Sequence, residues 1–116
     1  MRQVDLQSRP VRTDMSDQEC EQITAIAGHL NARMRELVED GLDVTEQIPA
    51  DAGYGVVRIR FPRVESGAAA QLLEARYQIR SGPADGLGML PFFVTDGVSF
   101  EDIDYVQGAV MDLLYR

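Results

Sequence analysis

The chain has 116 residues, enough for one domain that buries about two-thirds of its unfolded surface around a single core. Its net charge is −8 and its pI is near 4.5, and no basic stripe is present to neutralise phosphates, so the composition argues against nucleic-acid binding. All 11 basic residues are arginines. Without lysine, this chain alone has no side-chain amine for a Schiff base, a P-loop or a lysine base.

The N-terminal residues carry no apolar region of the kind found in a secretory signal, and no apolar run approaches the ~20 residues of a membrane span. Cys20 is the only cysteine, so an internal disulfide is not possible, and we expect a cytoplasmic location. We interpret residues 1–15 as an extended N-terminal arm that docks through Val4, Leu6 and Val11. Residues 16–116 form a single predicted domain.

The first predicted helix begins at Ser16. Ser16 and Glu19 have the spacing of a capping box, which satisfies two backbone amides at a helix start. Gly41 supplies a left-handed stop. Between them, apolar residues recur at helical spacing at Ile23, Ile26, Ala27, Leu30, Met34, Leu37 and Val38.

Two strands, predicted as an antiparallel pair, follow in 42–45 and 56–62. In the second, Val57, Ile59 and Phe61 alternate with Arg58 and Arg60, which is typical of a half-buried strand that ends at Pro62. The next segments are a helix in 66–77 with Leu72 and Leu73 as its anchors, a short strand in 78–80, a loop in 81–88 and an apolar strand in 89–94. Pro91 indicates an edge position or a bulge for the last of these strands.

The closing helix begins at Ser99, with Asp102 in the capping-box position. Its apolar stripe consists of Ile103, Val106, Val110 and Leu113. Glycine costs about 1 kcal/mol relative to alanine inside a helix, so we expect close packing to require Gly108. The acidic residues around this helix start, with Asp96, have no EF-hand spacing, and we predict no metal site.

The element order αββαββα predicts an α+β fold, a two-layer sandwich in which a small, mostly antiparallel sheet is covered by helices. The alternative is a ferredoxin-like βαββαβ arrangement with the first helix as an addition.

The sequence offers no catalytic residues. His29, the only histidine, is interpreted as structural or solvated, and Cys20 as an ordinary thiol. Arg80 precedes a glycine-rich loop, and guanidinium groups bind carboxylates or phosphates bidentately. We therefore predict that any small ligand binds at Arg80 and the loop glycines Gly82, Gly86 and Gly88.

Several motifs, in order, resemble the C-terminal small domain of fold-type I pyridoxal-phosphate enzymes, particularly class V aminotransferases and cysteine desulfurases. They are "GLDV", "GVVRIRFP", "LLEARYQIRSG" and "SFEDIDYVQGAVMDLL". The last matches the family's closing helix at Ser99, Glu101, Asp102, Ile103 and Asp104. The family's cofactor lysine lies in the large domain, which is missing here. Alignment on "EDID" puts Pro91 where the family commonly carries a carboxylate-binding arginine, and Arg80 lies one strand earlier.

The resemblance implies a stand-alone, non-catalytic interaction or regulatory module. One alternative is the small subunit of a split pyridoxal-phosphate enzyme, completed by a separate large-domain chain; another is a small-ligand-binding domain. Pyridoxal phosphate is expected only with such a large-domain partner. We expect a homodimer or that partner, because the apolar stripe from Ile23 to Val38 and the segment 89–94 would otherwise lose the surface that covers them. No nucleic acid or membrane partner is expected.

Overall fold

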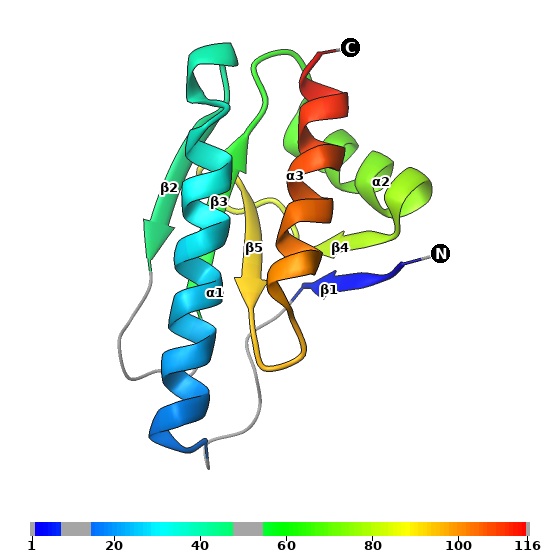
Figure 1. The fold of residues 1–116 in the computed structure, drawn as a ribbon. Coiled ribbons are helices and arrows are strands. Elements are labelled where there is room, and N and C mark those ends of the chain that lie inside the picture. The colour runs from blue at the N-terminus through cyan, green and yellow to red at the C-terminus, as the bar shows by residue number, and fades with distance from the viewer. Residues whose placement is uncertain (1, 8–14, 48–54, 116) are drawn as a thin grey trace.

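A computed structural model describes residues 2–7, 15–47 and 55–115 of the chain (Figure 1). The elements in chain order are β1 (Val4–Leu6), α1 (Asp17–Arg35), the 3-10 helix η1 (Val38–Asp40), β2 (Asp43–Gln47), β3 (Gly55–Arg60), α2 (Ser66–Tyr77), β4 (Ile79–Ser81), β5 (Leu90–Val94) and α3 (Phe100–Leu114). The predicted α+β class is therefore confirmed, and the order αββαββα is preceded by one additional strand.

The strands form two sheets. In the first, β3 lies between β2 and β5 and is antiparallel to both; in the second, β1 is parallel to β4. Helices α1 and α3 lie side by side across one face of the three-stranded sheet, and α2 lies beside β4 at the other side of the molecule (Figure 1). Helices α1 and α3 thus cover the three-stranded sheet, and the chain has three helices and two small sheets in roughly the predicted order.

One part of the fold differs from the prediction. The N-terminal arm contributes β1, whose Val4 and Leu6 are buried as predicted, and β1 pairs in parallel with β4. Val11 lies outside the described residues. The described strands thus form a mixed pair of sheets. The chain order through β4 is βαββαβ, but a ferredoxin-like fold would join these strands in one sheet, so that alternative is wrong.

Helix α1 starts with the predicted capping box, in which Ser16 accepts from the Glu19 amide and the Glu19 carboxylate accepts from the Ser16 amide. The helix ends at Arg35, three residues before the predicted stripe ends, and Val38 is 45% exposed in η1. Gly41 has a φ of +107° and caps η1, so the left-handed stop is confirmed but it closes the 3-10 turn instead of the α-helix.

The central strand β3 alternates as predicted. Val57 and Ile59 are buried in the core, while Arg58 and Arg60 face the other side of the sheet. Pro91 lies in β5, the edge strand of this sheet. Its carbonyl accepts a hydrogen bond from the Gly82 amide, so its missing N–H falls on the side away from the β3 ladder. The predicted edge position is confirmed.

Two side-chain predictions for the helices need correction. In α2, Leu73 is buried, but Leu72 is only partly buried, because Ala69 provides the other core contact. In α3, the predicted stripe is buried, but Gly108 is exposed, and a Cβ built there would meet no atom within 4 Å. Close packing therefore does not require Gly108.

The apolar residues on which the expected dimer rested are buried within the chain itself. From Ile23 to Leu37 the α1 stripe packs against β3, β5 and α3, and Leu90, Phe92 and Val94 belong to the same core. These residues give no argument for a second copy. In the described part of the chain, no helix combines the length and the apolar character that crossing a membrane requires.

Candidate functional site

Arg80 lies on β4 and is exposed. Its Nε is 3.3 Å from Oε1 of Glu74 on α2, and its side chain remains 56% accessible. It lines a hollow of about 280 Å³ between β1 and the end of α2, together with Gln3, Val4, Asp5, Glu74 and Gln78. The guanidinium thus faces a polar hollow that already contains its own carboxylate partner.

The glycine-rich loop between β4 and β5 is organised around Asp85. Asp85 Oδ1 accepts from the amides of Leu87 at 2.9 Å and Met89 at 3.0 Å. Its Oδ2 lies 3.1 Å from Nε of Arg58 on β3, and both side chains are about three-quarters buried, at 24% and 26% exposed. The Met89 amide, with further contributions from the Leu87 amide and Arg58, holds the pKa of Asp85 below its usual 3.8. The loop amides that would bind an anion are therefore occupied by an internal carboxylate.

Among the described residues, two hollows lined by Arg80, of about 280 and 130 Å³, include none of the three loop glycines. Gly82 is buried, and a Cβ there would come within 2.9 Å of the side chains of Pro91 and Phe93. Gly88 has a φ of +74°, and its carbonyl accepts from the Ser66 hydroxyl at 2.6 Å. Gly82 and Gly88 thus have clear structural roles, and Gly86 lies in open space.

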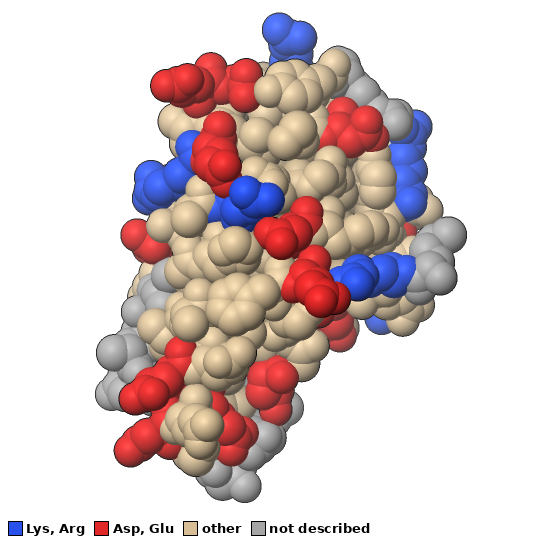
Figure 2. All heavy atoms as spheres, viewed as in Figure 1, with Lys and Arg blue, Asp and Glu red and all other residues tan. Residues whose placement is uncertain are grey.

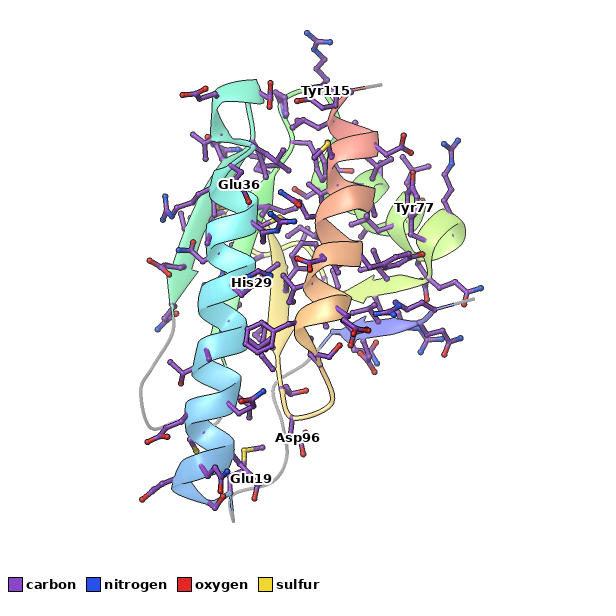
Figure 3. The ribbon with its side chains drawn as sticks, viewed as in Figure 1. Glu19, His29, Glu36, Tyr77, Asp96 and Tyr115 are labelled. Atoms are coloured by element: carbon purple, nitrogen blue, oxygen red, sulfur yellow. The ribbon has the colours of Figure 1, made fainter. Side chains whose placement is uncertain are left out.

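A larger hollow, of about 680 Å³, was not foreseen from the sequence. It lies between the first turns of α1 and the turn that joins β5 to α3. Ile23, Ile26 and Val98 form its apolar floor, and Glu19 and Asp96 approach from the two sides at the lower end of the molecule (Figure 3). The remaining lining residues are Ser16, Gln18, Gln22, Thr95, Ser99 and Phe100. Ser16 and Ser99 are engaged in their own helix caps, so neither hydroxyl is prepared as a nucleophile.

His29 contacts α3 in a cluster that links the two long helices. Its Nε2 lies 2.9 Å from Oδ1 of Asp104, and Nε of Arg33 lies 3.2 Å from the same oxygen without hydrogen-bond geometry. Phe100 packs edge-on against the imidazole, with ring centroids 5.4 Å apart. The hydrogen bond to His29, followed by the charge of Arg33, holds the pKa of Asp104 below its usual 3.8. These contacts of His29 include no serine or cysteine that the imidazole could activate as a nucleophile. They join α1 to α3.

Each residue of "SFEDIDY" caps α3, contacts another part of the chain or is buried in the core. Ser99 and Asp102 form the predicted capping box, and Asp102 also lies 2.8 Å from Arg2. Asp104 bonds to α1, and the Tyr105 hydroxyl donates to the Tyr77 carbonyl at the end of α2 at 2.8 Å. The motif therefore fixes α3 to α1, to the end of α2 and to Arg2, which precedes β1.

Charges and metal ligands add no further site in the described residues. Figure 2 shows arginines and acidic residues interspersed over the face formed by α1 and α3, with acidic side chains at its lower end. Within the described ranges, no three His, Cys, Asp or Glu side chains are grouped so as to hold a metal ion.

The fold is that of a two-layer α+β domain whose polar residues mainly join its elements. No family model matches the sequence, and no curated protein matches it. Several solved structures match the fold, among them the two that follow. The crystal structure of Pyrococcus protein-A1 superposes with a TM-score of 0.51 at 16% identity, over 78% of this chain and 24% of that chain. L,L-diaminopimelate aminotransferase from Chlamydomonas reinhardtii gives 0.50 at 20% identity, over 81% and 22% respectively.

The chain thus shares the fold of a part of these two structures, one of which is an aminotransferase, and it spans less than a quarter of the length of either. This supports the small-domain resemblance. The narrower class V assignment, the cytoplasmic location and the homodimer stay predictions.

Proposed function

We propose that the chain is a stand-alone, non-catalytic interaction or regulatory module built on the small-domain fold of pyridoxal-phosphate enzymes. The observation that carries this proposal is the mismatch in coverage. About four-fifths of this chain superposes on less than a quarter of an aminotransferase chain. Most of this sequence therefore has a counterpart in that structure, while most of that structure has no counterpart in this sequence.

The residues of this chain do not fit the cofactor. The sequence has no lysine to form a Schiff base with it. The amides of Leu87 and Met89 are held by Asp85, so that loop offers no free anion cradle there. Pro91, where the resembling enzymes commonly carry an arginine, packs against Gly82. Its neighbour across the ladder, Arg58, is paired with Asp85.

The second candidate is the small subunit of a split enzyme. The same superposition favours it, because a domain of this size could complete a separate large-domain chain. The two candidates differ in what a partner would do. A split enzyme regains turnover when the two chains are mixed, whereas a regulatory module binds without supplying catalytic groups.

The test is reconstitution. The purified chain is incubated with pyridoxal phosphate and a panel of amino acids, alone and with the product of any adjacent gene that encodes a large domain. If the chain is a regulatory module, we expect no transamination by the chain alone. A large-domain partner should then turn over without this chain, and adding the chain should only change the rate. Turnover that appears only when both chains are present would support the split enzyme and reject the module.

A further inference from the structure

The sequence contains an aspartate followed by a glycine at positions 40–41, 85–86 and 96–97. In such a pair the main-chain nitrogen of the glycine can attack the side-chain carboxyl carbon of the aspartate. The new C–N bond closes a succinimide ring, the nitrogen loses its proton, and the carboxyl OH leaves with that proton as water. Water then reopens the ring, and opening at the main-chain carbonyl leaves isoaspartate, which has one extra methylene in the backbone. Glycine favours the attack because it has no Cβ to shield its nitrogen.

At 40–41, the fold binds both reacting groups. The Gly41 amide donates to the Val38 carbonyl at 3.0 Å at the end of η1. Oδ2 of Asp40 accepts from the Tyr115 hydroxyl at 2.8 Å. Both hydrogen bonds must break before the nitrogen of Gly41 can reach the carboxyl carbon of Asp40, so we expect this pair to react slowly in the folded chain.

At 85–86, the fold binds the carboxylate. Asp85 accepts the amides of Leu87 and Met89 through Oδ1 and pairs with Arg58 through Oδ2. These contacts, the bond from the Met89 amide foremost, hold the pKa of Asp85 below its usual 3.8. Little of the protonated acid, the form that can lose its OH, is therefore present at neutral pH. The carboxyl group is also held away from the nitrogen that follows it.

The pair at 96–97 forms the turn between β5 and α3, at the lower end of the molecule (Figure 3). The Val98 amide donates to the Thr95 carbonyl at 3.3 Å, which makes Asp96 and Gly97 the two central residues of this turn. Both are exposed. The hydrogen bonds among the described residues include none from the Gly97 amide, and a Cβ built at Gly97 meets no atom within 4 Å. The attacking nitrogen is therefore exposed and unhindered.

We propose that the Asp96–Gly97 pair is a modification site at which isoaspartate forms spontaneously, faster than at 40–41 or 85–86. The extra methylene lengthens the turn two residues before Ser99, the N-cap of α3. The same turn borders the hollow of about 680 Å³ beside α1. Isoaspartate at this position would thus change both the start of α3 and the wall of that hollow. The inference is independent of the proposed function.

Ageing of the full-length chain at neutral pH and physiological temperature tests the proposal. Electron-transfer fragmentation of its peptides distinguishes isoaspartate from aspartate and locates it, with an unaged sample as the baseline. Gly97→Ala and Gly86→Ala are a matched pair of variants. Neither glycine has a positive φ, and a Cβ at either position meets no atom within 4 Å, so both variants should fold. Circular dichroism before ageing checks this.

We expect isoaspartate to accumulate severalfold faster at residue 96 than at residues 40 and 85. Gly97→Ala should slow it, because the added methyl group shields the nitrogen, and Gly86→Ala should leave the rate at residue 96 unchanged. In urea the three pairs should react at similar rates, because the contacts that protect Asp40 and Asp85 are lost. Three results would overturn the proposal: equal or faster reaction at residue 40 or 85 in the folded chain, no effect of Gly97→Ala, or a preference for residue 96 that persists in urea.

Discussion

Oδ1 of Asp104 on α3 lies 2.9 Å from Nε2 of His29 on α1, and this contact joins the two helices that cover the sheet. The folded state holds the pKa of Asp104 below 3.8, so the ionised carboxylate favours folding. That contribution is present above the unfolded pKa and is lost as the pH falls through the lower, folded pKa. We expect Asp104→Asn to lower the free energy of unfolding at neutral pH, and the difference from the parent chain to shrink as the pH falls below about 4 and to disappear below the folded pKa of Asp104.

Urea denaturation across this pH range measures the effect. Glu21→Gln is the matched control, because Glu21 is an exposed carboxylate on α1. Equal behaviour of the two variants would show that the contact between α1 and α3 does not depend on Asp104.

The second prediction concerns Asp85, which orders the loop between β4 and β5. Its carboxylate accepts the amides of Leu87 and Met89 and pairs with Arg58, so Asp85→Ala should release the loop from the sheet. Leu87, already 76% exposed, gains further freedom. We expect the Leu87 and Met89 amides to exchange with deuterium faster by NMR, while the Val57 amide in β3 is unchanged. Unaltered exchange at both loop amides would contradict the assignment of Asp85 as the residue that orders the loop.

Replacing Gly108 and Gly82 by alanine should change the stability of the chain in opposite directions. Gly108 lies inside α3 with open space around its Cα, so Gly108→Ala should stabilise the chain by about 0.5–1 kcal/mol. Gly82→Ala places a Cβ within 2.9 Å of Pro91 and Phe93 and should destabilise it by about 1–3 kcal/mol. Chemical denaturation of both variants provides the comparison. A stabilising Gly82→Ala would show that β5 does not pack against this position as closely as described.

Alanine substitutions of Arg58 and of Arg80 should also differ in their effect on stability. Arg80 forms an exposed pair with Glu74, so Arg80→Ala should change stability by no more than about 0.5 kcal/mol. Arg58 is largely buried beneath the loop, so Arg58→Ala should cost about 1 kcal/mol or more. Thermal denaturation of the two variants decides the matter. If Arg80→Ala proved the more destabilising, Arg80 would be a structural residue and its place in a predicted ligand site would lose its basis.

Much of this fold is predictable from local sequence, because caps and alternation act over a few residues. The capping boxes at Ser16 and Ser99 and the stripe of α3 depend on spacings of three and four residues. The parallel pairing of β1 with β4 joins residues 75 apart, and a three-residue strand has too little periodicity to announce it. The prediction of close packing at Gly108 is wrong, because the sequence around a helical glycine is the same whether the glycine faces a neighbouring element or open space.

The candidate site was predictable only in part. The sequence places Arg80 beside a glycine-rich loop, but it does not show that Asp85 turns back onto the amides of that loop. Likewise, the contact of His29 with Asp104 spans 75 residues, and no spacing within either helix signals it. The hollow between α1 and the β5–α3 turn arises from the packing angle of distant elements, which no motif encodes.

The central proposal is that this chain, which shares its fold with a part of an aminotransferase, is a module that does not carry out the chemistry of such an enzyme. The most direct measurement incubates the full-length chain with pyridoxal phosphate, reduces it with borohydride and maps the products by peptide mass spectrometry. Because the sequence has no lysine, we expect no internal adduct, with any modification confined to the α-amino group. A stoichiometric adduct at an internal residue, or conversion of the cofactor by amino acids with the chain alone, would contradict the account.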